Sequence, residues 1–375
     1  MARSRAPAVT RPELAGLAER VSTWQLQHGR HDLPWQGTRD PYRIWLSEIM
    51  LQQTQAATVI PWYQRFLRRF PDLATLASAS LDEVLTLWAG LGYYARARHL
   101  HQCAQIVYTR YAGRFPQTAA ELARLPGIGP STAAAIAALS HGERTPILDG
   151  NVRRVFMRLE ALDADPAAAS TLRALWALAQ RIIEAAPASL DMTAYTQGLM
   201  DLGATVCTRH RPDCARCPLA GDCLAHRQGL QNALPRPRKR RDRPLRQSTV
   251  LILQHEDHVL LTRRPARGIW GGLWSLPEFA DAPALQDYCL HHAQAGQPAR
   301  ALATFEHDFT HFRLQIHPWY QPVEGRRPGP AAEQAWVSLP ALARHGLPAP
   351  IARLLAGLQA GAGACALPSA GPARQ

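Results

Sequence analysis

Residues 207–223 read CTRHRPDCARCPLAGDC, which separates four cysteines by six, two and five residues. Thiolates are the ligands of iron–sulfur clusters, and the spacings let one short segment surround a single [4Fe–4S] cubane. We therefore interpret the four cysteines as cluster ligands: Cys207, Cys214, Cys217 and Cys223. Two alternatives stay open. A structural zinc site usually has paired C-x2-C knuckles, of which one is present, and a disulfide pair needs an oxidising compartment.

The length and charge of the chain set limits on its class. Its 375 residues exceed what one hydrophobic core usually serves, so two domains are expected. The formal net charge of +13 favours a polyanionic partner, with nucleic acid as the first candidate, although an arginine-rich composition can have the same charge without that function. No apolar run reaches the ~20 residues of a membrane span, and residues 1–10 lack a signal core, so a cytoplasmic protein is expected.

Apolar periodicity predicts that the N-terminal domain is all-α. Across residues 12–225, apolar side chains recur at three- and four-residue spacing, for example throughout 41–59. Residues 226–247 are rich in proline and arginine and predict a linker. The two ends of the chain are expected to be a flexible N-terminus and a disordered tail, at 1–11 and 360–375.

A second, α+β domain is predicted for residues 248–359. Two short apolar runs flank Glu256-Asp257 and predict a β-hairpin. Residues 301–305 and 309–318 predict another pair of strands.

Residues 125–132, LPGIGPST, join two helical patterns as a helix–hairpin–helix motif does. Gly127 and Gly129 permit a tight turn whose backbone N–H groups stay free at the start of the next helix. Such a surface binds phosphate without reading base sequence. A lone Gly-x-Gly turn often only links helices, but together with the cysteine segment this one predicts DNA binding.

Two carboxyl groups lie on either side of the hairpin in the sequence. Glu48 follows Ile44 by four residues, which places its carboxyl on the apolar face of a helix, where desolvation raises its pKa. Asp149 lies in a turn before another helix, whose dipole favours its ionised form. Cleavage of a glycosidic bond needs one protonated and one ionised carboxyl. An ion pair for Glu48 and a plain helix cap for Asp149 are the alternatives.

The segment that ends in the cysteine loop resembles the MutY family of adenine DNA glycosylases, within the endonuclease III superfamily. The matching strings are LPW at 33–35, WLSEIMLQQTQ at 45–55, GLGYYAR at 90–96, the hairpin, LDGNVRR at 148–154 and MDLG at 200–203. The C-terminal part is similar to a Nudix domain through GGLW at 271–274 and FTHF at 309–312. It lacks the carboxylate cluster that holds magnesium for phosphate hydrolysis, so it is expected to recognise the lesion.

The resemblance implies a multi-domain protein, with an all-α helix–hairpin–helix glycosylase domain and its [4Fe–4S] cluster loop followed by a Nudix-like α+β domain. It implies a monomer that removes adenine mispaired with 8-oxoguanine or guanine from double-stranded DNA. Glu48 would protonate adenine N7, Asp149 would stabilise the sugar cation, and Asn151 would position Asp149 or the DNA. The residues implied at the adenine pocket are Trp35, Gln197 and Ser131. Those implied at the DNA or the lesion are Gln53, Thr54, Tyr93, Gly127, Gly129, Thr310 and His311.

Position 131 bears on the type of reaction. Relatives that also cut the strand carry a catalytic lysine at this point of the hairpin, whereas this chain has Ser131, and its only lysine is Lys239 in the predicted linker. A Schiff base therefore has no amine nearby, and a monofunctional, hydrolytic glycosylase is expected. The alternatives are a bifunctional glycosylase/lyase acting on oxidised pyrimidines and a non-catalytic DNA-binding protein.

Overall fold

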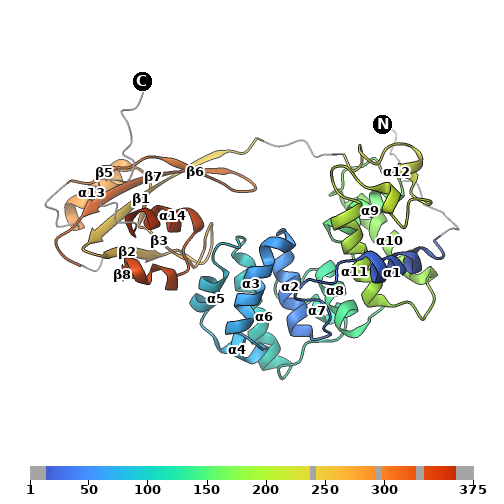
Figure 1. Ribbon diagram of the computed structural model, residues 1–375. Helices are drawn as coiled ribbons and strands as arrows, with labels where there is room; N and C mark the ends of the chain where they lie inside the picture. Colours follow the sequence, from blue (N-terminus) through green and yellow to red (C-terminus); the bar gives the residue numbers. More distant parts are fainter. Residues whose placement is uncertain (1–13, 237–241, 293–297, 327–332, 360–375) are drawn as a thin grey trace. The chain divides into compact units, whose positions relative to one another are not determined.

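The chain forms two compact units, one from residues 1–78 and 99–239 and the other from 79–98 and 240–375. Figure 1 shows helices in the first unit and a sheet with helices in the second. The computed structural model describes residues 14–236, 242–292, 298–326 and 333–359. No helix in these ranges is long and apolar enough to cross a membrane.

The first unit is helical throughout its described residues, as the apolar spacing predicts. Its core joins α1, α8, α9, α10 and α11, and three of the four loop cysteines pack at its edge. The helices are α1 (Leu17–His28), α2 (Pro41–Leu51), α3 (Ala56–Arg69), α4 (Leu73–Ser78), α6 (Ala95–Arg110, which begins in the other unit), α7 (Ala119–Leu122), α8 (Pro130–His141), α9 (Gly150–Leu159), α10 (Ala169–Ala185), α11 (Met192–Asp201) and α12 (Leu224–Arg227). A π-helical turn (Leu202–Val206) directly precedes the cysteine loop, and a 3-10 turn (Cys214–Arg216) lies in it.

Aspartate and proline residues start the helices that position the site. The Asp40 side chain caps α2 by accepting a hydrogen bond from Tyr42 N, and Pro41 occupies the first turn, where its missing N–H costs nothing. Asp149 caps α9 in the same way, with Val152 N donating at 2.7 Å. α8 begins at Pro130, directly after the hairpin glycines. These caps fix where each helix begins.

The structure divides the stretch 41–59, predicted as continuously helical, into α2 and α3. Gln53 has a φ of 58°, in the left-handed region, and the Thr54 N–H turns back to Leu51 O at 3.2 Å. Apolar spacing continues across this break, which is why periodicity alone does not reveal it. The break brings Gln52 to the hairpin, where its Nε2 donates to Gly127 O at 3.2 Å.

The second unit is built on a mixed eight-stranded sheet with the path β3-β2-β1-β7-β5. β1 and β7 run parallel, and the other paired strands run antiparallel. The strands are β1 (Leu245–His255), β2 (His258–Arg263), β3 (Trp274–Ser275), β4 (Glu278–Phe279), β5 (Arg300–Ala301), β6 (Phe305–Asp308), β7 (Arg313–Pro322) and β8 (Gln334–Ser338). The helices are α5 (Leu81–Trp88), α13 (Ala282–His292), α14 (Ala349–Gln359) and a 3-10 turn (Leu339–Arg344).

The predicted hairpin is confirmed, because β1 and β2 pair with His255 opposite His258 across Glu256-Asp257. The second predicted strand pair is shifted. Residues 309–312 form a turn between β6 and β7 instead of starting a strand, and Phe309 N donates to Phe312 O at 2.9 Å. Aromatic residues favour strands, so their presence suggested the wrong start. Because β7 begins only after residue 312, the middle of the 309–312 turn is exposed.

The compact units differ from the predicted domain boundaries in two places. Residues 79–98 group with the C-terminal unit, where Arg263 Nη1 donates to Asp82 Oδ2 at 3.1 Å and Arg98 Nη1 donates to Gly271 O at 2.7 Å. The first unit also continues past 225, since Leu234 is buried and its carbonyl accepts from Arg158 Nε at 2.8 Å. The predicted flexible N-terminus and tail lie outside the described residues.

Candidate active site

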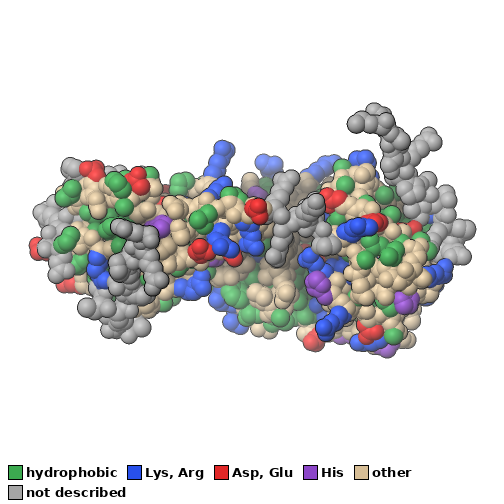
Figure 2. Space-filling view, turned by 90° about the horizontal axis from the view of Figure 1, so that it is seen from above, with side chains coloured by type: hydrophobic (Ala, Val, Ile, Leu, Met, Phe, Trp, Pro, Cys, Tyr) green, Lys and Arg blue, Asp and Glu red, His purple; other side chains and the backbone are tan. Residues whose placement is uncertain are grey.

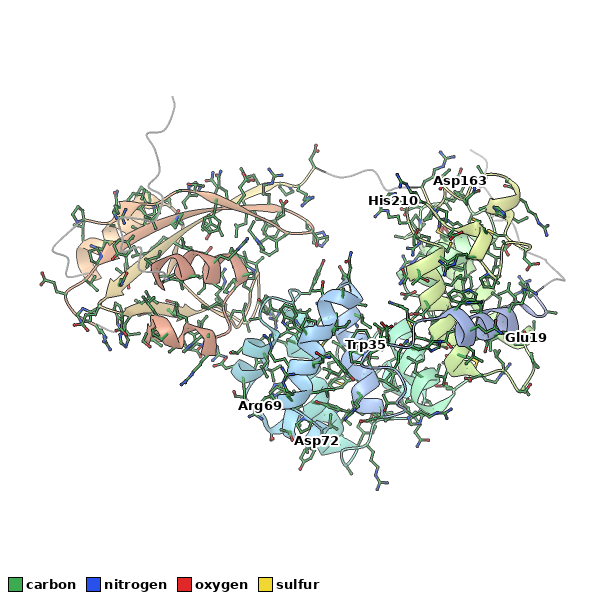
Figure 3. The ribbon with its side chains drawn as sticks, in the orientation of Figure 1. Glu19, Trp35, Arg69, Asp72, Asp163 and His210 are labelled. Carbon is green, nitrogen blue, oxygen red and sulfur yellow. The ribbon has the colours of Figure 1, made fainter. Side chains whose placement is uncertain are left out.

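A cavity of about 220 Å³ opens in the first unit. An indole, aliphatic groups, two carboxyl residues and three glutamines line it, which suits a flat base with polar edges. The lining residues that bear on the chemistry are His31, Trp35, Ile44, Ser47, Glu48, Leu139, Ala194 and Gln197. Trp35, labelled in Figure 3, packs edge-on against Tyr63 with ring centroids 5.4 Å apart. Two of the three residues implied at an adenine pocket therefore share one cavity with Glu48.

Glu48 lies on α2 and lines the cavity beside Ile44 and Ser47, both of them buried. Burial, followed by the charge of Asp149, raises the pKa of Glu48 to about 8. A carboxylic acid that keeps its proton near neutral pH can act as a general acid. The apolar-face position predicted from the helical spacing is confirmed.

Asp149 lies close enough to Glu48 for its charge to act on it. Burial raises the pKa of Asp149 too, although hydrogen bonds from the Val152 and Asn151 backbone and the charges of Arg154 and Arg153 oppose this rise. The sequence predicted the helix cap but not the burial. Two coupled carboxyl groups release their protons one after the other, so the second proton is held more tightly than the first.

Asn151 holds the first turn of α9 in place. Its Oδ1 accepts a hydrogen bond from Arg154 Nη2 at 2.8 Å, and the same nitrogen donates to Gly203 O. Arg154 Nε donates to Cys207 O at 2.8 Å. Asn151 and Arg154 thereby connect the carboxyl site to the start of the cysteine loop.

Ser131 does not line the cavity with Trp35 and Gln197. Its Oγ instead accepts a hydrogen bond from Leu148 N at 3.0 Å. The hydroxyl therefore holds the backbone directly before Asp149. The structure therefore gives Ser131 a supporting contact, and its implied contact with the adenine stays a prediction.

The hairpin has the geometry that its glycines predict. Gly127 has a φ of 77°, and a Cβ there would lie 2.8 Å from His99 Cβ, so a larger residue fits neither the conformation nor the space. Gly129 precedes α8 with extended backbone. Of the two neighbouring residues implied at the DNA, Gln53 is exposed and Thr54 is half-buried.

The four loop cysteines lie near one another, and Cys207, Cys217 and Cys223 pack at the edge of the first unit's core. Burial raises the pKa of Cys214, Cys217 and Cys223, and the charge of Cys207 raises each of them further, so the four sulfurs lie within electrostatic range of one another. In the described ranges, no three His, Cys, Asp or Glu side chains are grouped closely enough to bind one metal ion. Thiols on one loop beside apolar residues are the donor set that an iron–sulfur cluster uses, so these residues fit it.

Arg158 supports this loop and was missed in the sequence. It is almost fully buried, its Nη1 donates to Cys207 Sγ at 3.2 Å and to Thr208 O at 2.7 Å, and its own carbonyl accepts from Cys223 Sγ at 3.3 Å. An arginine on an otherwise apolar face of a helix could have indicated this role, because a buried guanidinium needs several hydrogen-bond acceptors around it.

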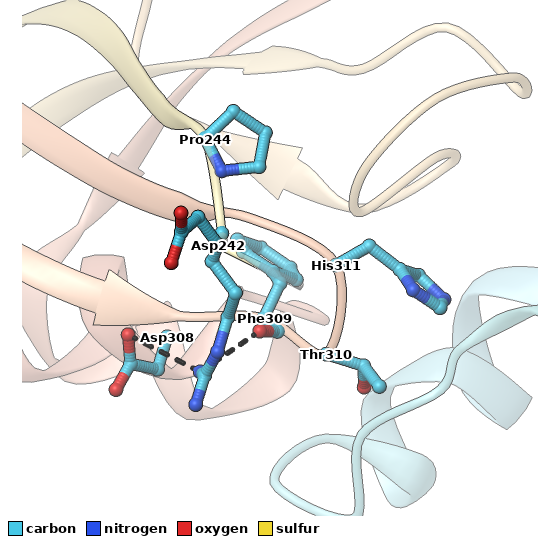
Figure 4. Close-up of a pocket in the computed structure, with 7 residues that line it drawn as sticks. Asp242, Pro244, Asp308, Phe309, Thr310 and His311 are labelled. Atoms are coloured by element: carbon cyan, nitrogen blue, oxygen red, sulfur yellow. Dashed lines mark hydrogen bonds and ion pairs between the residues drawn. The ribbon is translucent and has the colours of Figure 1, made fainter. Parts of the chain in front are cut away.

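The second unit carries a separate cavity of about 660 Å³ at the turn between β6 and β7 (Figure 4). Arg243 Nη1 donates to Phe309 O at 3.2 Å and pairs with Asp308. Thr310 and His311 are exposed at the tip of the turn. Within this unit the hydroxyl of Tyr93 lies 3.2 Å from Thr310 Oγ1.

The phenylalanines of FTHF have a structural role. Phe309 stacks on Phe312 with ring centroids 4.5 Å apart, and it also contacts Trp270 at 5.4 Å. Stacked rings fix the base of the turn and leave the Thr310 and His311 side chains exposed at its tip.

Comparisons with known proteins agree with this architecture. Residues 46–181 match the HhH-GPD superfamily of base excision DNA repair proteins, and residues 248–357 match the NUDIX domain. The chain is 36% identical to the adenine DNA glycosylase of Buchnera aphidicola subsp. Baizongia pistaciae, over 80% of this chain and 84% of that one. It is 34% identical to that of subsp. Acyrthosiphon pisum, over 89% and 95%. The structure of a thermostable thymine-DNA glycosylase is similar with a TM-score of 0.50 and 28% identity, covering 56% of this chain and 95% of that one.

The helical fold and these matches define a DNA glycosylase of base excision repair, a hydrolase of N-glycosyl bonds. The helical unit alone does not specify the base, because a thymine-DNA glycosylase shares it. The relatives that match along most of the chain do specify it: the chain belongs to the adenine DNA glycosylase family. The predicted fold class is thereby confirmed.

Proposed function

We propose that this protein removes adenine mispaired with 8-oxoguanine or guanine and leaves an abasic site. The observation that carries the proposal is Glu48, an acid with a pKa of about 8 in a base-sized cavity beside a second carboxyl. A flipped adenine would enter this cavity after leaving the base stack. The protein is proposed to act in the cytosol, as a monomer.

In the proposed reaction Glu48 donates its proton to adenine N7, which makes the base a better leaving group. Asp149, ionised, faces the oxocarbenium-like sugar and stabilises its positive charge. Glu48, now deprotonated, accepts a proton from the water that attacks the sugar. Asn151 keeps the first turn of α9, and with it Asp149, in place.

The reaction is proposed to stop at base removal. Ser131 occupies the hairpin position where strand-cutting relatives carry a lysine, and it holds the Leu148 backbone. A hydroxyl cannot form the Schiff base that strand cleavage needs. Water is therefore the proposed nucleophile.

The four loop cysteines are proposed to hold a [4Fe–4S] cluster. Bound there, the cluster would cross-link the loop through its four thiolates. Arg158 and Arg154 brace the loop through Cys207. The loop then presents its exposed arginines to phosphate.

The turn at 309–312 is proposed to contact 8-oxoguanine. Thr310 and His311 are exposed while the phenylalanines anchor the turn, and the Tyr93 hydroxyl lies beside Thr310. Gln53, Thr54, Gly127 and Gly129 are proposed to contact the DNA at the hairpin of the first unit.

The function is tested with duplexes that contain A·8-oxoguanine, A·G, A·T or thymine glycol. Cleavage at adenine that appears only after alkali is the expected result, because an abasic site is alkali-labile. Cleavage at thymine glycol without alkali, or covalent trapping with borohydride, would instead identify a glycosylase/lyase.

Adenine release is expected to fall as pH rises through about 8. The active form has Glu48 protonated, and its pKa of about 8 sets the pH at which half of that form is lost. Single-turnover rates between about pH 6 and about pH 10 measure this, with duplex binding as a control at each pH. A rate that stays constant through this range would contradict the assignment of the acid.

Thr310→Ala is expected to reduce the preference for A·8-oxoguanine over A·G by roughly tenfold, the effect of one or two hydrogen bonds. The rate on A·G should change little, because guanine does not present the oxidised edge. Thr304→Ala is a matched control, since Thr304 is another exposed threonine of the same unit. If Thr310→Ala still prefers A·8-oxoguanine over A·G as strongly as wild type does, residues other than Thr310 recognise the lesion.

A further inference from the structure

An ion pair between a buried carboxylate and a partly exposed guanidinium lies behind the wall of the adenine cavity. Asp201, the last residue of α11, is fully buried and forms an ion pair with Arg30 Nη2 at 2.6 Å. Arg30 Nε and backbone N also donate to the carboxylate, at 2.8 Å and 3.0 Å. Taking a carboxylate out of water is costly even when it is paired, so its position requires a reason.

The fourth donor to Asp201 comes from the cavity wall. Gln197 Nε2 donates to Asp201 Oδ1 at 2.9 Å, one helical turn back along α11. A carboxylate paired with a guanidinium only accepts hydrogen bonds, so Gln197 must turn its NH₂ group to Asp201. Among the described residues, no hydrogen bond reaches Gln197 Oε1, and Gln197 lines the cavity with Glu48.

We infer that Asp201, held by Arg30, is a positioning residue that fixes the amide of Gln197 with its carbonyl oxygen toward the base. This inference rests on the proposed function. A carbonyl oxygen accepts from the amino group that adenine carries at C6, whereas guanine and hypoxanthine carry a carbonyl at that position. A site that commits a buried acceptor to one donor discriminates against bases that lack the donor. Asp201 thereby contributes to selectivity for the 6-amino group without touching the base.

The test compares two bases opposite 8-oxoguanine: adenine, and purine, which has hydrogen at C6 but keeps N7. Asp201→Asn replaces a group that only accepts by an amide that also donates, so it no longer fixes the orientation of Gln197 and lets Gln197 reverse. Single-turnover release of adenine is expected to fall by about tenfold, while release of purine changes less than about threefold. Gln197→Ala should produce the same pattern, and adding Asp201→Asn to it should cause no further loss.

Comparison of the two bases separates positioning from folding. A variant that is merely unstable loses adenine and purine release equally, and that outcome would overturn the inference. If Asp201→Asn does not fold, the double variant Arg30→Gln with Asp201→Asn takes its place, because two amides can hydrogen-bond to each other where the ion pair stood. This double variant should also lose the preference for adenine over purine. Asp163→Asn breaks an exposed ion pair with Arg236 in the same unit and should leave the preference unchanged.

Two failures are distinguishable. A wild-type protein that releases no adenine would contradict the proposed function. A wild-type protein that prefers adenine to purine, together with folded Asp201 variants that keep the preference, would contradict only the role of Asp201.

Discussion

Glu48→Gln is expected to slow single-turnover release of adenine by about 10²- to 10⁴-fold, the usual contribution of general acid catalysis. Glutamine keeps the size of the side chain and its place beside Ile44 and Ser47, but it has no proton to give to N7. Binding to an A·8-oxoguanine duplex should stay within a few-fold of wild type, since the base pocket is preserved. Gel-shift titration and single-turnover release on the same duplex measure the two effects.

The stability of the same variant provides its control. The pKa of Glu48 is about 8 in the folded protein and near 4.5 when exposed, so the folded state holds a proton that the unfolded state releases. The contribution of Glu48 to the free energy of unfolding therefore falls as pH rises from 4.5 to about 8. Glutamine carries no charge, so Glu48→Gln should be more stable than wild type at pH 8, by on the order of 2 kcal/mol; this figure is reduced because the Glu48 side chain is only half-buried.

Loss of activity with a gain in stability is a combination that misfolding cannot produce. A variant with release within about tenfold of wild type would remove Glu48 from the mechanism. Asp149→Asn should also lose release, because a neutral amide cannot stabilise a sugar cation. Its stability is less informative, since asparagine still caps a helix.

The features predicted well from sequence are those in which a single residue type determines the local backbone geometry or the local ligand set. A cysteine segment, a glycine turn and an aspartate before a helix each specify a local geometry, and the structure places Gly127 in the left-handed region and Asp149 at the start of α9. The face of Glu48 followed from helical spacing alone.

The features that were missed depend on contacts between distant residues. The break at Gln53 keeps the helical period, so it needs the backbone angles to be seen. Arg30 and Asp201 are separated by 171 positions, and neither residue type in isolation suggests that the two form an ion pair. The grouping of residues 79–98 with the C-terminal unit likewise rests on contacts such as Arg263 with Asp82. Local pattern cannot report such partners.

Cys214→Ser is expected to abolish the brown colour of the purified protein, because the proposed cluster needs four thiolates. Cys289→Ser is the matched control: Cys289 is a buried cysteine of the second unit and should keep the colour when replaced. Visible absorption together with iron and sulfide content measures the difference. A colourless wild-type protein with stoichiometric zinc would contradict the cluster and favour the zinc alternative.

Cys214→Ser should also bind DNA more weakly, and the dependence of its affinity on salt concentration should show whether phosphate contacts are lost. The loop exposes Arg209, His210, Arg211 and Arg216 between its ligands, and His210 is labelled there in Figure 3. Basic side chains are also spread over the visible surface of each unit in Figure 2, so only part of the DNA affinity is expected to depend on the loop. Removing one phosphate-binding side chain from the interface lowers the slope of log affinity against log salt by about one, so Cys214→Ser should show both a weaker affinity at low salt and a shallower slope. A weaker affinity with an unchanged slope would mean that the loop supports the fold and does not itself meet the phosphates.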